Sequence, residues 1–205
     1  MKMRHSLALF FAGLVTFTLA GCVSSPPENR SNICAIFEEK NDWYEDAKTA
    51  RARWGIPISA MMAIMHQESR FEAKAKPPRQ KIFGVIPGLR PSDAYGYSQA
   101  LGSTWQQYER SAGNYGADRD DFEDAIDFIG WYNAQTHRIN GVAVDDVYNL
   151  YLAYHEGHGG FKRGTYKGKP WLIDVAKKVD RRAKDFSKQL YGCQKKLESR
   201  GWLDW

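Results

Sequence analysis

The sequence lacks an apolar run of the length that is typical of a membrane-spanning helix. The stretch from Leu7 to Leu19 is only about as long as the hydrophobic part of a secretory signal peptide, and Lys2 and Arg4 precede it. Residues 1–21 are therefore interpreted as a cleaved leader and are left out of the reasoning about the fold. The alternative is an uncleaved anchor.

The sequence also lacks a concentration of charge of one sign. It has 29 basic and 24 acidic residues. Removal of residues 1–21 takes away Lys2 and Arg4 and leaves 27 basic residues, an excess of +3. A nucleic-acid partner would require a concentrated basic face, so this mild and interspersed excess argues against one.

Cysteine is scarce, with three in 205 residues, and the first has a distinctive context. Leu19-Ala20-Gly21-Cys22 resembles the lipobox of bacterial lipoproteins. The resemblance implies cleavage before Cys22 and a lipid on that cysteine. Val23 in place of an aspartate favours anchoring in the outer membrane, with the protein in the periplasm. An ordinary signal peptide followed by a chance cysteine is the alternative.

The other two cysteines, Cys34 and Cys193, flank almost the whole remaining chain. In an oxidising compartment an even pair favours a disulfide, here between the first and last helices. A loop this long corresponds to about 4–5 kcal/mol in the chain-entropy treatment. Two unrelated buried thiols are the alternative. Residues 22–32 are predicted to be a lipidated tether, and residues 33–205 a single domain with a substantial core.

Helical periodicity dominates the domain, and no internal repeat is visible. Helices are predicted over residues 33–53 and 56–71, and others begin near Ser103, Asp120, Asp145 and Pro170. The fold class is therefore all-α. Residues 76–91 are different, with four prolines and two glycines, and are interpreted as a Pro-rich insertion with a small β-hairpin inside it. A segment of this kind serves either as a cleft wall or lid or as a plain surface insertion.

Residues 56–71 carry a carboxyl group in an unusual position. Ile58, Met61 and Met65 recur at helical spacing, and Glu68 continues the same apolar face. Burial of a carboxyl group raises its pKa, which would make Glu68 a proton donor near neutral pH. The alternative is that Glu68 turns to solvent or pairs with Arg70.

Three short segments form a recognisable set. The segment Glu68-Ser69-Arg70-Phe71 is similar to Glu-Ser-x-Phe, and Gly96-Tyr97-Ser98-Gln99 is similar to Gly-Leu-Met-Gln. The third segment, Ala153-Tyr154-His155-Glu156-Gly157, is similar to Ala-Tyr-Asn-Ala-Gly. Each thus resembles a motif of the family 1 lytic transglycosylases. These peptidoglycan-cleaving enzymes have a lysozyme-like helical domain. The resemblance covers roughly residues 55–160.

The resemblance implies cleavage of the β-1,4 bond between N-acetylmuramic acid and N-acetylglucosamine without water as the nucleophile. Glu68 would first donate a proton to the leaving oxygen and then accept one from the muramoyl C6 hydroxyl group, closing a 1,6-anhydro ring. The substrate's N-acetyl group would stabilise the oxocarbenium-like state in place of a second carboxylate. No cofactor is implied, and the partners are peptidoglycan glycan strands and, through Cys22, a membrane.

Position in the motifs also implies supporting roles. Ser69 would position the substrate or the end of the catalytic helix, Gln99 would contact the sugar, and Tyr154 would place its hydroxyl group beside Glu68. Glycines would allow the backbone to approach the saccharide, although a turn or a helix cap explains them equally well. The remaining motif residues are expected along the substrate. The glycines are Gly96 and Gly157. The remaining motif residues are Tyr97, Ser98, His155 and Glu156.

The chain departs from the family pattern at several points. Residues 72–95 make the first two motifs unusually distant, Ser98 replaces methionine, and His155-Glu156 replace Asn-Ala. Glu156 is either a surface carboxylate or a second carboxylate near Glu68 that would permit hydrolysis. His155, Glu156 and His158 do not have the His-Glu-x-x-His spacing of zinc proteases, so no metal is predicted.

Two other functions compete with the transglycosylase interpretation. The first is a goose-type or related lysozyme that adds water with help from Glu156. The second is a catalytically silent lipoprotein that binds peptidoglycan.

Overall fold

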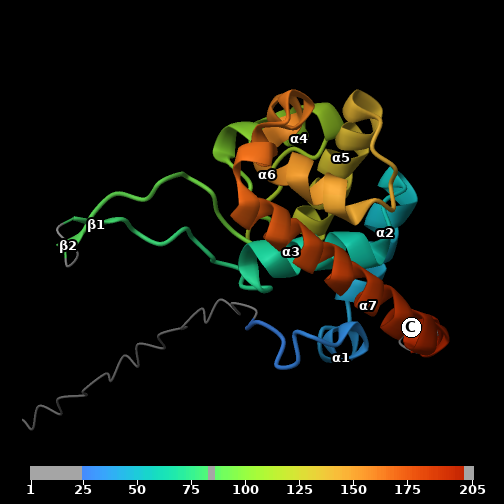
Figure 1. Cartoon of the computed structure of the whole chain (residues 1–205). Helices are drawn as coiled ribbons and strands as arrows, with labels where there is room; N and C mark the ends of the chain where they lie inside the picture. The colour runs from blue at the N-terminus through green and yellow to red at the C-terminus, as the bar shows by residue number, and fades with distance from the viewer. Residues whose placement is uncertain (1–24, 83–85, 201–205) are drawn as a thin grey trace, which may run out of the picture.

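The computed structural model describes residues 25–82 and 86–200 of the chain (Figure 1). The leader and Cys22 lie outside the described residues, so cleavage and lipidation stay predictions. Within the described ranges, no helix combines the length and the apolar character needed to cross a bilayer.

The described residues form seven α-helices, one short 3-10 helix and two very short strands. The predicted all-α class is confirmed, because β1 and β2 have two residues each and form only a small antiparallel ladder. The elements are α1 (Ile33–Glu39), α2 (Trp43–Trp54), α3 (Ile58–Ser69), β1 (Lys81–Ile82), β2 (Ile86–Pro87), α4 (Gly102–Ala112), α5 (Phe122–Asn140), α6 (Val147–Arg163), the 3-10 helix η1 (Thr165–Gly168) and α7 (Pro170–Arg200).

The prediction of one continuous helix over residues 33–53 was wrong. The chain leaves the helical conformation at Lys40, where φ is −111° and ψ is 83°, and α2 begins at Trp43. Asn41 and Asp42 fill the gap, and such side chains compete with helical hydrogen bonding and favour turns. Two helices therefore form in place of one.

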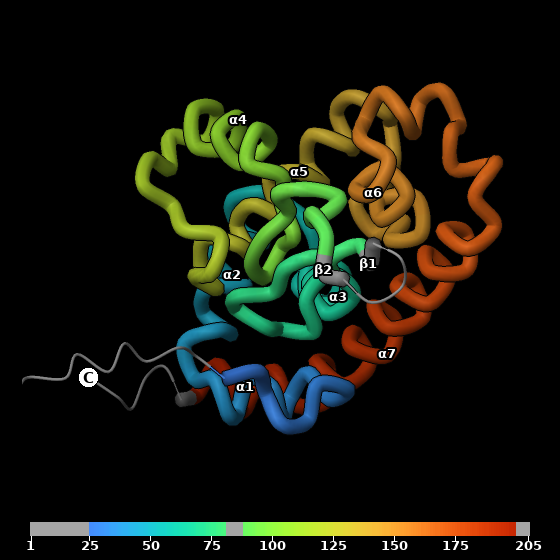
Figure 2. The backbone as a smooth tube through the Cα atoms, turned by 90° about the vertical axis from the view of Figure 1, so that its left-hand side faces the viewer, coloured from blue at the N-terminus to red at the C-terminus, as the bar shows by residue number. Residues whose placement is uncertain are grey.

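Helix α3 is the central element of the domain. It packs against α2, α5 and α7, and Figure 2 shows it within the other helices. Every residue from Ala60 to Met65 is fully buried. An apolar surface around the whole helix is typical of a core helix rather than a surface one. Glu68, one turn further along, is therefore carried on a backbone that neighbouring helices hold on several sides.

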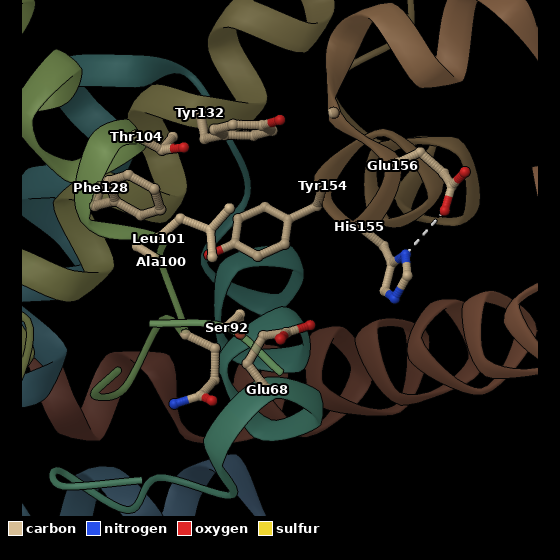
Figure 3. A pocket seen from close by; sticks show the side chains of 12 residues that line it. Glu68, Ser92, Ala100, Leu101, Thr104, Phe128, Tyr132, Tyr154, His155 and Glu156 are labelled. Carbon is tan, nitrogen blue, oxygen red and sulfur yellow. Dashed lines mark hydrogen bonds and ion pairs between the residues drawn. The ribbon is translucent and has the colours of Figure 1, made fainter. Parts of the chain in front are cut away.

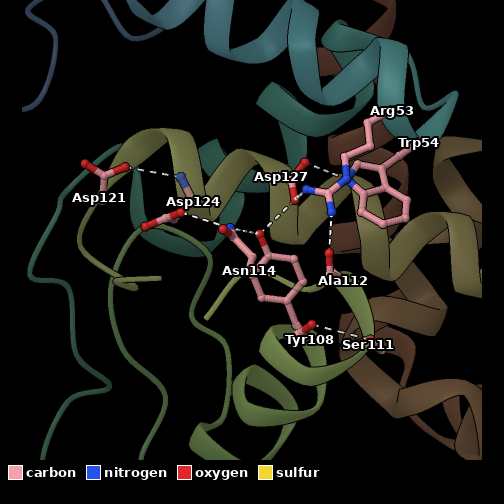
Figure 4. A network of polar contacts seen from close by, with 9 residues as sticks. All are labelled: Arg53, Trp54, Tyr108, Ser111, Ala112, Asn114, Asp121, Asp124 and Asp127. Atoms are coloured by element: carbon pink, nitrogen blue, oxygen red, sulfur yellow. Dashed lines mark hydrogen bonds and ion pairs between the residues drawn. The ribbon is translucent and has the colours of Figure 1, made fainter. Parts of the chain in front are cut away.

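A polar network joins α4 to α2 and α5 (Figure 4). Asp127 on α5 accepts hydrogen bonds from Arg53 Nη1 (3.0 Å), Trp54 Nε1 (2.6 Å) and the Tyr108 hydroxyl group (2.7 Å). Asn114 in turn donates to the Tyr108 oxygen over 2.7 Å. Each carboxylate oxygen of this buried acid thus has a donor, as a buried charge requires. The network fixes the position of α4, whose first turn lines the pocket described below.

Helix α7 runs along one side of the domain and is bonded covalently to α1. Cys34 and Cys193 are joined by a disulfide, with their Cα atoms 6.1 Å apart. The apolar face of α7 is buried along its length at Leu172, Val179 and Phe186. The predicted start of the helix at Pro170 is confirmed.

The described parts of the Pro-rich segment extend away from the helical body. In Figure 1 the two arms that lead to β1 and β2 leave the domain beside the end of α3. The ladder pairs Lys81 with Pro87 and Ile82 with Ile86. Ser92, immediately beyond this segment, lines the pocket that contains Glu68.

Candidate active site

A pocket of about 390 Å³ opens beside the last turn of α3. Its wall combines the end of α3, the segment before α4, the first turn of α4, the middle of α5 and the bend in α6 (Figure 3). The lining residues are Glu68, Ser92, Gln99, Ala100, Leu101, Thr104, Phe128, Tyr132, Tyr154, His155, Glu156 and Gly157. Each of the three sequence motifs thus contributes at least one residue to the pocket lining.

Glu68, in the last turn of α3, lines this pocket. Its side chain is partly buried, and desolvation raises its pKa from the ordinary 4.5 to about 7, while a hydrogen bond from Tyr151 opposes the rise. An ion pair with Arg70 was the alternative for Glu68. Among the described residues, Glu68 and Arg70 form no ion pair. At neutral pH both protonation states of Glu68 are therefore well populated.

The tyrosine that hydrogen-bonds Glu68 is Tyr151, whereas the sequence assigned this role to Tyr154. The hydroxyl group of Tyr154 donates instead to the Ser98 carbonyl oxygen over 2.7 Å. Burial and the charge of Glu68 raise the pKa values of both phenols, so both remain neutral donors. The two side chains are three residues apart on α6, so both can face α3. Tyr151 supports the acid, and Tyr154 fixes the Gly96–Gln99 segment.

Ser69 holds the end of α3 and does not line the pocket. Its Oγ donates to the Met65 carbonyl oxygen (3.2 Å) and accepts from the Phe71 N–H (3.1 Å). Arg70 and Phe71 both have left-handed backbone conformations, with φ of 54° and 63°, and Phe71 is fully buried. Of the two roles predicted for Ser69, the structure gives it the positioning of the helix end. This sharp stop immediately after Glu68 fixes the last turn of the helix.

Gly96 approaches another part of the protein, and not the pocket. Its φ is +77°, and a Cβ atom there would lie 1.9 Å from the Arg119 carbonyl oxygen. Tyr97 is buried in the core, with its ring 5.7 Å from that of Trp43 and 5.9 Å from that of Phe122. The expectation that these two residues lie along a substrate is therefore corrected: they pack the segment against the domain.

Ser98 and Gln99 complete the segment. Ser98 is fully buried, and its Oγ has no hydrogen-bond partner among the described residues. Its carbonyl group, not its side chain, serves the site by accepting from Tyr154. Gln99 lines the pocket with φ of +51°, and its Nε2 donates to the carbonyl oxygens of Ala75 and Gly96, both over 2.9 Å. Because both amide hydrogens are used, the side-chain oxygen is the group that Gln99 can offer to a ligand.

Glu156 also lines the pocket, but its carboxylate is engaged with cationic and polar partners. Its carboxylate accepts from Lys169 Nζ (2.7 Å), lies 3.0 Å from His155 Nδ1 and accepts from the Thr165 hydroxyl group. Desolvation alone would raise its pKa, but hydrogen bonds from Lys169, Thr165 and His155 lower it to about 2. Figure 3 shows the contact with His155. A carboxylate held in this way is a weak base.

His155 and His158 are directed to different surroundings. His158 Nε2 lies 3.1 Å from the Thr136 hydroxyl oxygen, and its ring stacks on Tyr132 with centroids 4.4 Å apart. The bend at Gly157, where φ is 75° and ψ is 156°, separates the two histidines. Over residues 25–82 and 86–200, no three His, Cys, Asp or Glu side chains are grouped as a metal site would require.

Sequence reasoning missed several pocket residues. Phe128 and Tyr132 belong to the apolar stripe of α5, and nothing in the pattern distinguishes a pocket wall from the core. Leu101 and Thr104 come from the turn that starts α4. Tyr151 lies on the apolar face of α6 and outside the three motifs. A buried tyrosine needs a partner for its hydroxyl group, and this requirement could have singled it out.

A family model described as "Transglycosylase SLT domain" matches residues 10–193 of the chain. No curated protein matches the sequence.

Proposed function

Because the chain belongs to the transglycosylase SLT domain family and so acts on peptidoglycan, we propose that it is a lytic transglycosylase that cleaves the β-1,4 bond between N-acetylmuramic acid and N-acetylglucosamine. Glu68 is the catalytic acid and then the catalytic base. The observation that carries this assignment is a partly buried carboxyl group with a pKa of about 7 inside the pocket.

The proposed reaction needs one group that gives and then takes a proton. Protonated Glu68 donates to the glycosidic oxygen as the bond from the muramoyl C1 atom to that oxygen breaks. The carboxylate then removes the proton from the muramoyl C6 hydroxyl group, whose oxygen bonds to C1. Water is neither consumed nor released, and Glu68 regains its proton. A pKa near the working pH suits both steps.

The neighbours of Glu68 support this sequence of steps. Tyr151 donates a hydrogen bond that favours the carboxylate needed in the second step. The apolar surroundings that include Phe128 and Tyr132 favour the neutral acid needed in the first. The carbonyl oxygen of Gln99 is placed to accept from a sugar hydroxyl or N-acetyl N–H group.

Hydrolysis assisted by Glu156 is the second candidate, since Glu156 lines the same pocket. A general base must be able to accept a proton from water, and the ion pair with Lys169 and a pKa of about 2 make Glu156 poorly suited to this role. Two-carboxylate glycosidases place both groups beside the scissile bond with one free to act as base or nucleophile. Because the Glu156 carboxylate is engaged by Lys169, we favour the transglycosylase reaction over hydrolysis.

Product mass and one substitution test the proposal. Purified protein is incubated with peptidoglycan sacculi, and the soluble products are analysed by mass spectrometry. We expect muropeptides that lack one water relative to hydrolysed ends, and loss of product with Glu68→Gln. Glu72→Gln, at an exposed carboxyl group just beyond α3, is the matched control and should leave product release unchanged.

The other outcomes identify the competing functions. Products that retain the water would establish hydrolysis instead. Equal and negligible release by the wild type and Glu68→Gln, with both proteins still bound to sacculi, would establish a binding protein.

A further inference from the structure

Trp171 is a large, exposed aromatic side chain next to a residue that lines the pocket. It is the second residue of α7, and 55% of its surface is accessible to solvent. Its ring lies 5.2 Å from that of His155, at an angle of 77°, and His155 itself lines the pocket. The pocket wall thus continues outward as two aromatic rings.

The indole N–H group of Trp171 is the second notable feature of this side chain. The indole N–H groups of Trp54 and Trp105 donate to Asp127 and to the Ala117 carbonyl oxygen. Within residues 25–82 and 86–200, the indole N–H of Trp171 donates no hydrogen bond. A single exposed apolar residue needs no explanation, but this one packs against His155, which lines the pocket.

The backbone around Trp171 is held in place before any ligand binds. Lys169, two residues earlier, pairs with the buried carboxylate of Glu156 over 2.7 Å. Pro170 begins α7 with a restricted φ, and Leu172 is fully buried. An anchored position of this kind lowers the entropy lost when a ligand is bound.

We infer that Trp171 and His155 form an additional subsite that binds one N-acetylhexosamine ring of the glycan strand beyond the sugars at Glu68. A pyranose ring has an apolar face of C–H groups and a rim of hydroxyl groups. Its face can cover the indole ring while a rim oxygen accepts from the indole N–H. The inference rests on the proposed function for the identity of the strand.

The subsite predicts that affinity depends on the length of the oligosaccharide. Binding is measured by titration calorimetry in a Glu68→Gln background, with chitotriose and chitohexaose as probes. Trp171→Ala should weaken binding of chitohexaose about 10-fold and leave chitotriose unchanged, because only the longer chain extends to Trp171. Trp171→Phe, which keeps an aromatic face, should restore most of the affinity for chitohexaose.

Tyr191→Ala is the matched control, since Tyr191 lies on the same helix and is 89% exposed. It should leave both affinities unchanged. Equal affinity of Trp171→Ala and its parent for chitohexaose overturns the subsite, and so does an equal loss with both probes.

The sacculus assay keeps the two proposals separate. If the wild type releases anhydro-muropeptides and Trp171→Ala binds chitohexaose normally, the function stands and the subsite fails. If Trp171→Ala loses affinity for chitohexaose alone while the wild type releases no product, the subsite stands and the enzymatic function fails.

Discussion

Replacing the acid Glu68 with glutamine is expected to stabilise the protein at neutral and alkaline pH. Because desolvation raises the pKa of Glu68 in the folded state to about 7, from the ordinary 4.5, ionisation of this group opposes folding. Below pH 4.5 the group is neutral in both states and makes no difference. Between pH 4.5 and 7 the unfolded chain ionises first, so wild-type stability falls as the pH rises.

The size of the effect follows from the two pKa values. They differ by about 2.5, and 1.36 kcal/mol for each tenfold change in the ionisation constant gives a penalty of about 3 kcal/mol above pH 7. Glutamine has nearly the shape of glutamate and can accept from Tyr151, but it carries no charge. The variant should therefore match the wild type near pH 4 and exceed it by about 3 kcal/mol near pH 8.

Urea denaturation of both proteins at pH 4, 6 and 8 measures this difference. Glu72→Gln serves as the control, and its free energy of unfolding should follow that of the wild type at all three values. The quantity to compare is the difference in free energy of unfolding between Glu68→Gln and the wild type. If this difference is the same at pH 8 as at pH 4, the argument that burial raises the pKa of Glu68 is refuted.

Two further predictions concern the neighbour of the acid and the covalent link. Tyr151→Phe removes a hydrogen bond that stabilises ionised Glu68, so the alkaline limb of the pH–rate profile should move up by about one pH unit; an unchanged limb would mean that the contact has no role in tuning the acid. Reduction of the disulfide between Cys34 and Cys193 should lower the free energy of unfolding by about 2–5 kcal/mol, measured by denaturation with and without reductant, and equal midpoints would contradict this.

The sequence predicted the fold class and the position of the acid because both depend on local periodicity. The apolar stripe of residues 58–65 required burial on the side that carries Glu68, and the structure has α3 in the core. The break after Glu39 depended on a balance between weak helix propensity and tertiary packing, and periodicity alone does not register that balance.

The neighbours of the acid were harder to predict because they depend on rotations between elements. Tyr151 and Tyr154 lie on the same face of α6, and their spacing cannot determine which hydroxyl group meets Glu68 and which meets the Ser98 carbonyl group. A motif match also does not distinguish residues that contact a ligand from residues that hold the motif together. Tyr97 belongs to the second kind, since its ring packs in an aromatic cluster.

The disulfide between α1 and α7 also determines how the domain would carry a mechanical load. A force applied to the chain at its N-terminal side reaches Cys34 near the start of α1 and passes through the covalent bond into α7. Helices α2 and α3 lie within the loop that this bond closes between two cysteines 159 positions apart, so the force cannot extend them while the bond is intact. The helix that carries Glu68 is thereby shielded from tension applied at the N-terminal side of α1.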